Sequence, residues 1–151
     1  MGSRYFALIS GILYVLIGVL GFVPALVVPA TAPELAVNAG YGYLIGFFPI
    51  NILHNIVHLA VGGLGLASYP SFPRARLFAR GLTIFYGLLA VMGLIPVLQT
   101  TFGLIPIFSH DVWLHALTAG IAGIVGFMTP DVSTAEQAQR EQSMTGTTSN
   151  R

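Results

Sequence analysis

Residues 49–58, PINILHNIVH, and residues 106–115, PIFSHDVWLH, set the architecture of this chain. In each stretch, a proline opens an apolar run and a histidine follows nine residues later. Proline is well tolerated in the first turn of a helix, because the N–H that it lacks would have no partner there. The two stretches therefore predict the second and the fourth membrane-spanning helix of one small bundle.

The composition predicts a polytopic integral membrane protein. The 151 residues are 55% hydrophobic and only 7% charged, with a mean hydropathy of +0.82, whereas a soluble domain carries about 25% charged residues. Six arginines and five acidic residues lie mostly at the ends and in one short loop, and lysine is absent. Without cysteine, disulfides, thiolate catalysis and thiolate-bound metals are excluded. No basic stripe or motif indicates a nucleic-acid partner, so the expected surroundings are the lipid bilayer.

Apolar runs separated by proline-rich turns predict an all-α fold with four transmembrane helices. A single membrane domain is expected over residues 1–130, followed by a disordered polar tail over 131–151, which is rich in Ser, Thr, Gln and Glu. The expected spans cover residues 5–28, 49–67, 77–95 and 111–128.

The arginines predict the topology of this bundle. Arg4, the group at Arg74, Arg76 and Arg80, and the two arginines of the tail all fall on one side of a four-helix weave. The two loops on the other side contain no positive charge. The positive-inside rule therefore places both termini in the cytoplasm.

A weak internal repeat relates the two halves of the chain. Residues 13–24 align with 85–96, with Tyr, Gly and Pro in register, and residues 46–50 align with 103–107, after which His58 falls on His115. Two repeated helical hairpins of the same orientation have a pseudo-twofold axis along the membrane normal. We expect this axis to bring His58 and His115 together. Tyr14 and Tyr86 are expected nearer the cytoplasmic side.

Polar residues share one face of the second span and one face of the fourth, because they recur at intervals of three and four. In lipid such faces point into the bundle. Nine helical residues correspond to about 13 Å, which would place His58 and His115 near the midplane. The residues on these faces are Asn51, His54, Asn55 and His58 on the second span, and Asp111, His115 and Thr118 on the fourth.

These residues predict an intramembrane site made of two pairs. His54 is expected to face Asp111 in an outer pair, and His58 to face His115 in a deeper pair. Three imidazoles and a carboxylate supply four convergent ligands of the kind that a divalent transition metal prefers. The predicted metal ligands are therefore His54, His58, Asp111 and His115.

Other interpretations of the same residues stay open. A haem could be held by His58 and His115, although its propionates would find no arginine in the outer half of the bundle. The polar residues, including Asn51, Asn55 and Thr118, could instead form a hydrogen-bond network that only organises helix packing. Proton or ion transfer along this face is a further alternative.

The quoted motifs resemble a known family. They are Gly-x-x-Pro-Ile-Asn-x-x-His-Asn-x-x-His from Gly46, an Ala-Arg pair before the third span, Gly-Leu-Ile-Pro, and Asp-x-Trp-Leu-His-Ala from Asp111. Together they resemble a family of small four-helix bacterial membrane proteins known only as a domain of unknown function. More loosely, they resemble the four-helix membrane proteins related to DoxX. The resemblance covers about residues 5–128 and implies that Asn51, His54, His58, Asp111 and His115 belong to the family's pattern.

This resemblance implies a location in the bacterial plasma membrane, or in a thylakoid if the source is photosynthetic, and it implies no established activity. The chain has no Ser-His-Asp set, phosphate loop or paired-carboxylate site, which favours a protein that is not an enzyme. Two functions remain. One is a metal- or haem-binding membrane protein. The other is an accessory or assembly subunit, whose partner would be another membrane protein or a second copy of the chain.

Overall fold

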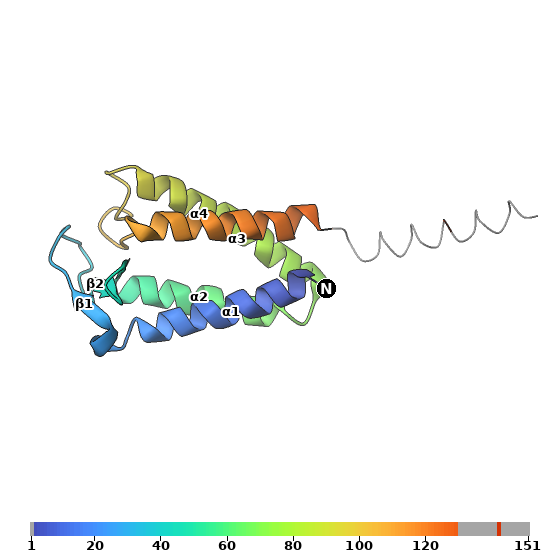
Figure 1. The fold of residues 1–151 in the computed structure, drawn as a ribbon, viewed down its shortest axis with the longest axis horizontal. Coiled ribbons are helices and arrows are strands. Elements are labelled where there is room, and N and C mark those ends of the chain that lie inside the picture. Colours follow the sequence, from blue (N-terminus) through green and yellow to red (C-terminus); the bar gives the residue numbers. More distant parts are fainter. Residues whose placement is uncertain (1, 130–141, 143–151) are drawn as a thin grey trace, which may run out of the picture.

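Four helices form the body of the protein, seen in a computed structural model that describes residues 2–129 and 142. The polar tail expected over residues 131–151 lies outside the described residues, apart from Gln142. α1 packs mainly against α2, and α3 mainly against α4, so that two antiparallel helical pairs lie side by side (Figure 1). The helices are α1 (Gly2–Leu20), α2 (Ile52–Ser68), α3 (Phe72–Leu94) and α4 (His110–Gly123), the last continuing into a π-helical turn, η2 (Ile124–Met128).

Three of these helical segments are long and apolar enough to cross a membrane: Gly2–Leu20, Phe72–Leu94 and His110–Met128. α2 is also apolar but has 17 residues, which corresponds to about 25 Å. Large apolar side chains cover the outside of the bundle, among them Leu77, Ile84 and Trp113, each at least 70% exposed. Such a surface is suited to lipid and not to water, so the expected helical membrane protein is supported.

The prediction of an all-α fold was wrong at one end of the bundle. A small antiparallel sheet forms there from β1 (Val27–Pro29), β2 (Gly42–Leu44) and β3 (Phe48–Ile50), in the order β1-β2-β3. α1 ends at Leu20 instead of residue 28, and a 3-10 turn, η1 (Pro24–Leu26), follows. Pro24 cannot donate the next helical hydrogen bond, and the β-branched Val27 and Val28 then pair with β2.

The start of α2 also differs from the prediction. Pro49 lies in β3 and not in the first helical turn, and α2 begins at Ile52. Asn51 caps this helix: its backbone is extended, and its side-chain oxygen accepts a hydrogen bond from the backbone N–H of His54 at 2.9 Å. At the third span, the helix begins at Phe72, ahead of the predicted start at residue 77, with Pro73 in its first turn.

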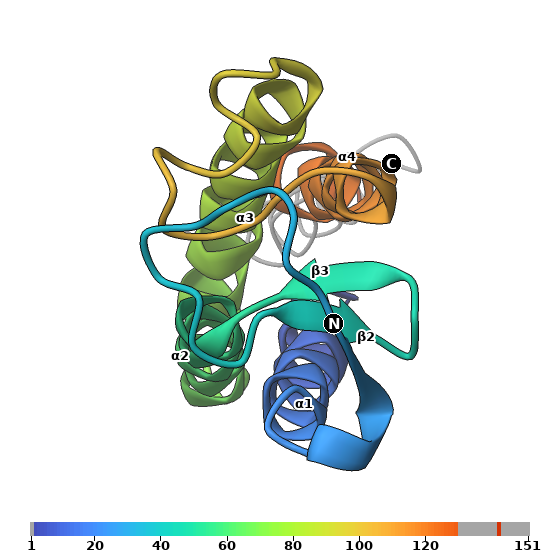
Figure 2. The ribbon, with the colours of Figure 1, turned by 90° about the vertical axis from the view of Figure 1, so that its left-hand side faces the viewer.

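The sheet and the loop between α3 and α4 cover one end of the bundle (Figure 2). Asn51 joins the two, because its side-chain amide donates hydrogen bonds to the carbonyl of Val37 at 2.8 Å and to that of Leu104 at 2.6 Å. Its side chain is fully buried. One amide thus caps α2 and binds both covering segments to it.

The opposite end of the bundle is held by arginines. Arg76 and Arg80 both donate from Nε to the carbonyl of Gly126, at 3.1 and 2.9 Å. Gly126 lies in the π-helical turn, where the regular ladder of helical hydrogen bonds is interrupted. Arg4 donates to the carbonyl of Tyr69 in the turn between α2 and α3. Three of the arginines that predicted the topology therefore also bind backbone carbonyls where helices end.

We predict that Asn51→Ala destabilises the protein by about 3 kcal/mol, because it removes three buried hydrogen bonds worth about 1 kcal/mol each. Thermal unfolding of detergent-purified protein would measure the loss as a drop of several degrees in Tm. Asn38→Ala is the matched control, since Asn38 is exposed. Equal Tm values for the two variants would contradict the role given to Asn51.

Candidate functional site

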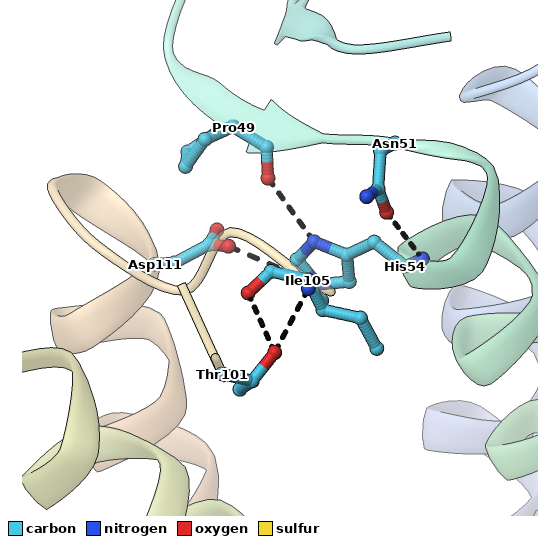
Figure 3. A network of polar contacts seen from close by, with 6 residues as sticks. All are labelled: Pro49, Asn51, His54, Thr101, Ile105 and Asp111. Atoms are coloured by element: carbon cyan, nitrogen blue, oxygen red, sulfur yellow. Dashed lines mark hydrogen bonds and ion pairs between the residues drawn. The ribbon is translucent and has the colours of Figure 1, made fainter. Parts of the chain in front are cut away.

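His54 is held in one orientation by the first turn of α2. Its Nδ1 lies 3.1 Å from the carbonyl oxygen of Pro49 (Figure 3). Because a carbonyl can only accept a hydrogen bond, Nδ1 carries the proton, and Nε2 of the neutral ring keeps a lone pair. That lone pair faces Asp111, whose Oδ2 lies 3.8 Å away. The ring is therefore set to act as a ligand through Nε2.

Asp111 and His115 complete a group of three donors with His54. Each of the three residues is at most 4% exposed, and each offers a ligand atom such that all three atoms lie within 4.8 Å of one another. Around a tetrahedral ion with bonds of about 2.1 Å, neighbouring donors lie about 3.4 Å apart. The 3.8 Å between Nε2 and Oδ2 is close to this value. A small inward rotation of the side chains would bring the set onto one ion.

Five aromatic rings form a closed circle at the same level. His54 stacks on His58 and also faces His115, and Tyr14 and Tyr86 connect the other two histidines. The distances between ring centroids are 4.5 Å for His54–His58, 5.6 Å for His58–Tyr14, 5.4 Å for Tyr14–Tyr86, 5.1 Å for Tyr86–His115 and 6.4 Å for His115–His54. All four helices therefore contribute to one core of polar aromatic residues.

The structure brings three of the four predicted metal ligands together and leaves the fourth outside this group. His54 and Asp111 lie together, as the outer pair was expected to, and His115 joins them. His58 lies beside this set, stacked on His54 and Tyr14, but outside the three-donor group. Each histidine of the expected deeper pair packs against a tyrosine, His58 against Tyr14 and His115 against Tyr86, and the pair itself stays a prediction.

The histidines lie closer to the starts of their helices than predicted. His58 is six positions past the start of α2, and His115 five past the start of α4, which corresponds to about 9 and 8 Å. The expected depth of about 13 Å came from a helix that begins at Pro49, whereas this proline lies in a strand. Tyr14 contacts His58 and Tyr86 contacts His115, although the sequence predicted that both tyrosines lie nearer the cytoplasmic side. The tyrosine shared by the aligned residues 13–24 and 85–96 was the signal that could have found them.

Several buried polar atoms in this region have no hydrogen-bond partner within residues 2–129. Buried polar groups are nearly always paired, so such atoms indicate a bound ion, a water or another ligand. Three of them belong to the donor set or to its neighbouring histidine, and one is the hydroxyl of Tyr86. The atoms are Nδ1 of His58, Nδ1 of His115, Oδ2 of Asp111, the Tyr86 hydroxyl oxygen and Oδ1 of Asn55.

The residues predicted for the polar network have three different surroundings. Asn51 caps α2 and binds the covering loops. Asn55 packs against Gly21, where an added Cβ would collide with its side-chain amide. Thr118 accepts a long hydrogen bond, 3.4 Å, from the hydroxyl of Tyr14.

We predict that Asp111→Asn stabilises chelator-treated protein. While Asp111 is ionised and the ring of His54 is neutral, neither group can donate a hydrogen bond to the other, whereas an amide at this position can donate to Nε2. A rise in Tm of a few degrees is expected, measured by thermal unfolding in detergent. Asp111→Leu, which cannot donate, should give a smaller rise or a fall. If Asp111→Asn lowered the Tm as much as Asp111→Leu does, the assigned tautomer would be wrong.

Comparison with known proteins gives one match. A family described as "Domain of unknown function (DUF4383)" matches residues 4–128. No curated protein and no solved structure matches the chain. The looser resemblance to DoxX-related proteins and the bacterial source stay expectations.

Proposed function

The chain belongs to DUF4383, a family of unknown function, and we propose that it is a membrane protein that binds one divalent transition-metal ion between its helical pairs. The ligands are His54 from α2 and Asp111 and His115 from α4. One observation carries the proposal: three buried ligand atoms from two helices lie within 4.8 Å of one another. His58, stacked on His54, is the nearest candidate for a fourth ligand.

The surroundings of His54 support a metal more strongly than a simple hydrogen-bond network. Metal-binding histidines usually donate their second ring N–H to a carbonyl or carboxylate, which fixes the tautomer and the ring orientation. The bond from His54 Nδ1 to Pro49 has this form. A carboxylate buried at membrane depth is costly unless a positive charge compensates it. A divalent cation beside Asp111 would supply that charge.

The ring contacts favour a bare ion over a haem. Tyr14 packs on His58, Tyr86 packs on His115, and the two tyrosines stack on each other at 5.4 Å. A porphyrin held between His58 and His115 would have to displace both tyrosines. A single ion between His54, Asp111 and His115 requires no such rearrangement.

We further infer that the two helical pairs are repeats of one hairpin. The register that aligns residues 13–24 with 85–96 relates α1 to α3, and the register that aligns 46–50 with 103–107 relates α2 to α4. Residues that correspond in these two registers are buried alike, which supports a twofold arrangement about the site. The corresponding pairs include Ala7 and Ala79, Tyr14 and Tyr86, His54 and Asp111, His58 and His115, and Gly65 and Ala122.

Close backbone contacts follow the same two registers. A Cβ added at Gly21 would collide with the side chain of Asn55, and a Cβ added at Gly93 would lie 2.8 Å from a methyl group of Val112. Gly93 corresponds to Gly21 in the repeat, and Val112 corresponds to Asn55. The same approach between a glycine and its neighbouring helix therefore occurs in both hairpins, which apolar composition alone would not produce.

In this proposal α2 also crosses the membrane, so the bundle has four spans, and both termini are cytoplasmic. The arginines support the orientation, because Arg4 lies in the first turn of α1 and Arg74, Arg76 and Arg80 lie in the first turns of α3, at the end of the bundle opposite the sheet (Figure 1). The metal then lies near the outer face of a bacterial inner membrane, under the sheet and the α3–α4 loop.

We predict that protein purified in mild detergent retains about one equivalent of a transition metal, as expected for a site with three protein ligands. His54→Ala, Asp111→Ala and His115→Ala should each lower the metal affinity by more than the roughly 10- to 100-fold typical of a lost supporting residue. Elemental analysis after dialysis measures this loss. His110→Ala is the matched control, because His110 adjoins Asp111 but is exposed.

The competing interpretation gives a different result in the same measurement. If the polar residues only organise the bundle, the protein contains no stoichiometric metal, and a chelator leaves its Tm unchanged. A haem would instead appear as a Soret absorption band that is lost in both His58→Ala and His115→Ala. Either result would contradict the proposed ion site.

A further inference from the structure

Two half-open pockets lie on opposite sides of the bundle, where the two helical pairs separate. One, of about 300 Å³, lies between α1 and α4, and the other, of about 650 Å³, lies between α2 and α3. Both are lined by residues from within the helices. In the proposed membrane orientation, the α1–α4 pocket therefore opens toward lipid.

The repeat relates one pocket to the other. The register between α1 and α3, together with the register between α2 and α4, converts the lining of the α1–α4 pocket into that of the α2–α3 pocket. The register between α2 and α4 comes from residues 46–50 and 103–107, which line neither pocket, so the agreement is independent support for that register. Corresponding lining residues include Phe6 and Phe78, Leu13 and Phe85, and Ile121 and Leu64.

The two pockets differ in chemistry at two corresponding positions. Where the α2–α3 pocket has Leu82 and Val61, the α1–α4 pocket has Ser10 and Thr118. Tyr14 also lines the α1–α4 pocket. At these two positions one side of the bundle has hydroxyl groups where the other side has apolar side chains; elsewhere the α2–α3 pocket is also lined by Ser68 and Arg74.

Tyr14 and Thr118 are the hydroxyls that a ligand could engage. The hydroxyl of Ser10 already donates to the carbonyl of Phe6 in its own helix. The bond from Tyr14 to Thr118 is long, at 3.4 Å, beyond the usual range for two hydroxyls. An oxygen atom of a ligand placed between the two hydroxyls could form a shorter hydrogen bond with each of them.

The α1–α4 pocket also adjoins the proposed metal centre. The ring of Tyr14 stacks on His58, and His58 stacks on His54, which is a member of the donor set. Leu114, another lining residue, directly precedes His115. The rings of Tyr14 and His58 therefore connect the Tyr14 hydroxyl to His54, one of the proposed metal ligands.

We propose that the α1–α4 pocket binds a neutral, single-headed amphipathic molecule of the bilayer, whose hydroxyl or carbonyl head hydrogen-bonds with Tyr14 and Thr118. A neutral head is inferred because, within the described chain, no charged side chain lines this pocket. Its volume is at the lower end of the range for small-molecule sites and suits one apolar chain or ring system. Binding in this pocket does not require the metal ion of the proposed function.

Photolabelling in lipid nanodiscs tests this site with two matched probes, a diazirine-bearing fatty alcohol and the hydrocarbon of equal length without the hydroxyl. We expect the alcohol to label peptides of α1 and α4 about fivefold more than the hydrocarbon does, the effect of one net hydrogen bond. Thr118→Val and Tyr14→Phe should abolish this preference. Ile121→Phe should reduce labelling by filling the pocket, whereas the corresponding change on the other side, Leu64→Phe, should not.

Equal labelling by the two probes would overturn the proposal, since an ordinary lipid-facing surface makes no such distinction. A preference of the same size at the α2–α3 pocket would overturn it as well. Metal content measured on the same variants separates this proposal from the metal centre. Thr118→Val should keep the metal and lose the preference, and His115→Ala should lose the metal and keep the preference.

Discussion

The buried amide of Asn51 fixes how the parts of this molecule meet. It caps α2, and it binds the carbonyls of Val37 and Leu104, so the two segments that cover the bundle are joined to one point. Because the surroundings contain little water, each of these hydrogen bonds would be expensive to lose. The cap also sets the first turn of α2, from which His54 reaches Pro49 and faces Asp111. The geometry of the proposed metal centre thus begins at this amide.

The interior of the bundle is unusual in its balance of small and polar residues. Within each helical pair, glycines and alanines allow close backbone approach: an added Cβ at Gly62 would lie 2.6 Å from the backbone of Val15. Between the pairs, the space is filled by the circle of histidine and tyrosine rings instead. Packing holds each hairpin together, whereas polar aromatic residues determine how the hairpins meet. This division leaves lateral pockets on both sides of the rings, and it explains how a polar centre can lie close to the lipid phase.

Much of the fold could be predicted from the sequence, because long apolar runs and the spacing of polar residues are local properties. Three helices are long and apolar enough to cross a membrane, as expected, and His54 and Asp111 lie together. The errors lay where local pattern and tertiary structure compete. Residues 27–29 look like the end of an apolar helix, yet they pair with the strand Gly42–Leu44 across an intervening loop. Pro49 looks like a helix start, but Asn51 is the better cap, and the depth calculated from Pro49 was too large.

Periodicity and composition were enough to establish an apolar exterior, four helices and one set of inward-facing polar residues, since these properties require no knowledge of distant contacts. Which donors converge is a different matter, because helical spacing places His54 and His58 on one face without saying which of them faces Asp111. That depends on the relative rotation of two hairpins, which is set by contacts between Asn51 and a loop 53 residues away. The grouping of His54 with Asp111 and His115, and the place of His58 beside Tyr14, follow from that rotation and could be seen only in the folded chain.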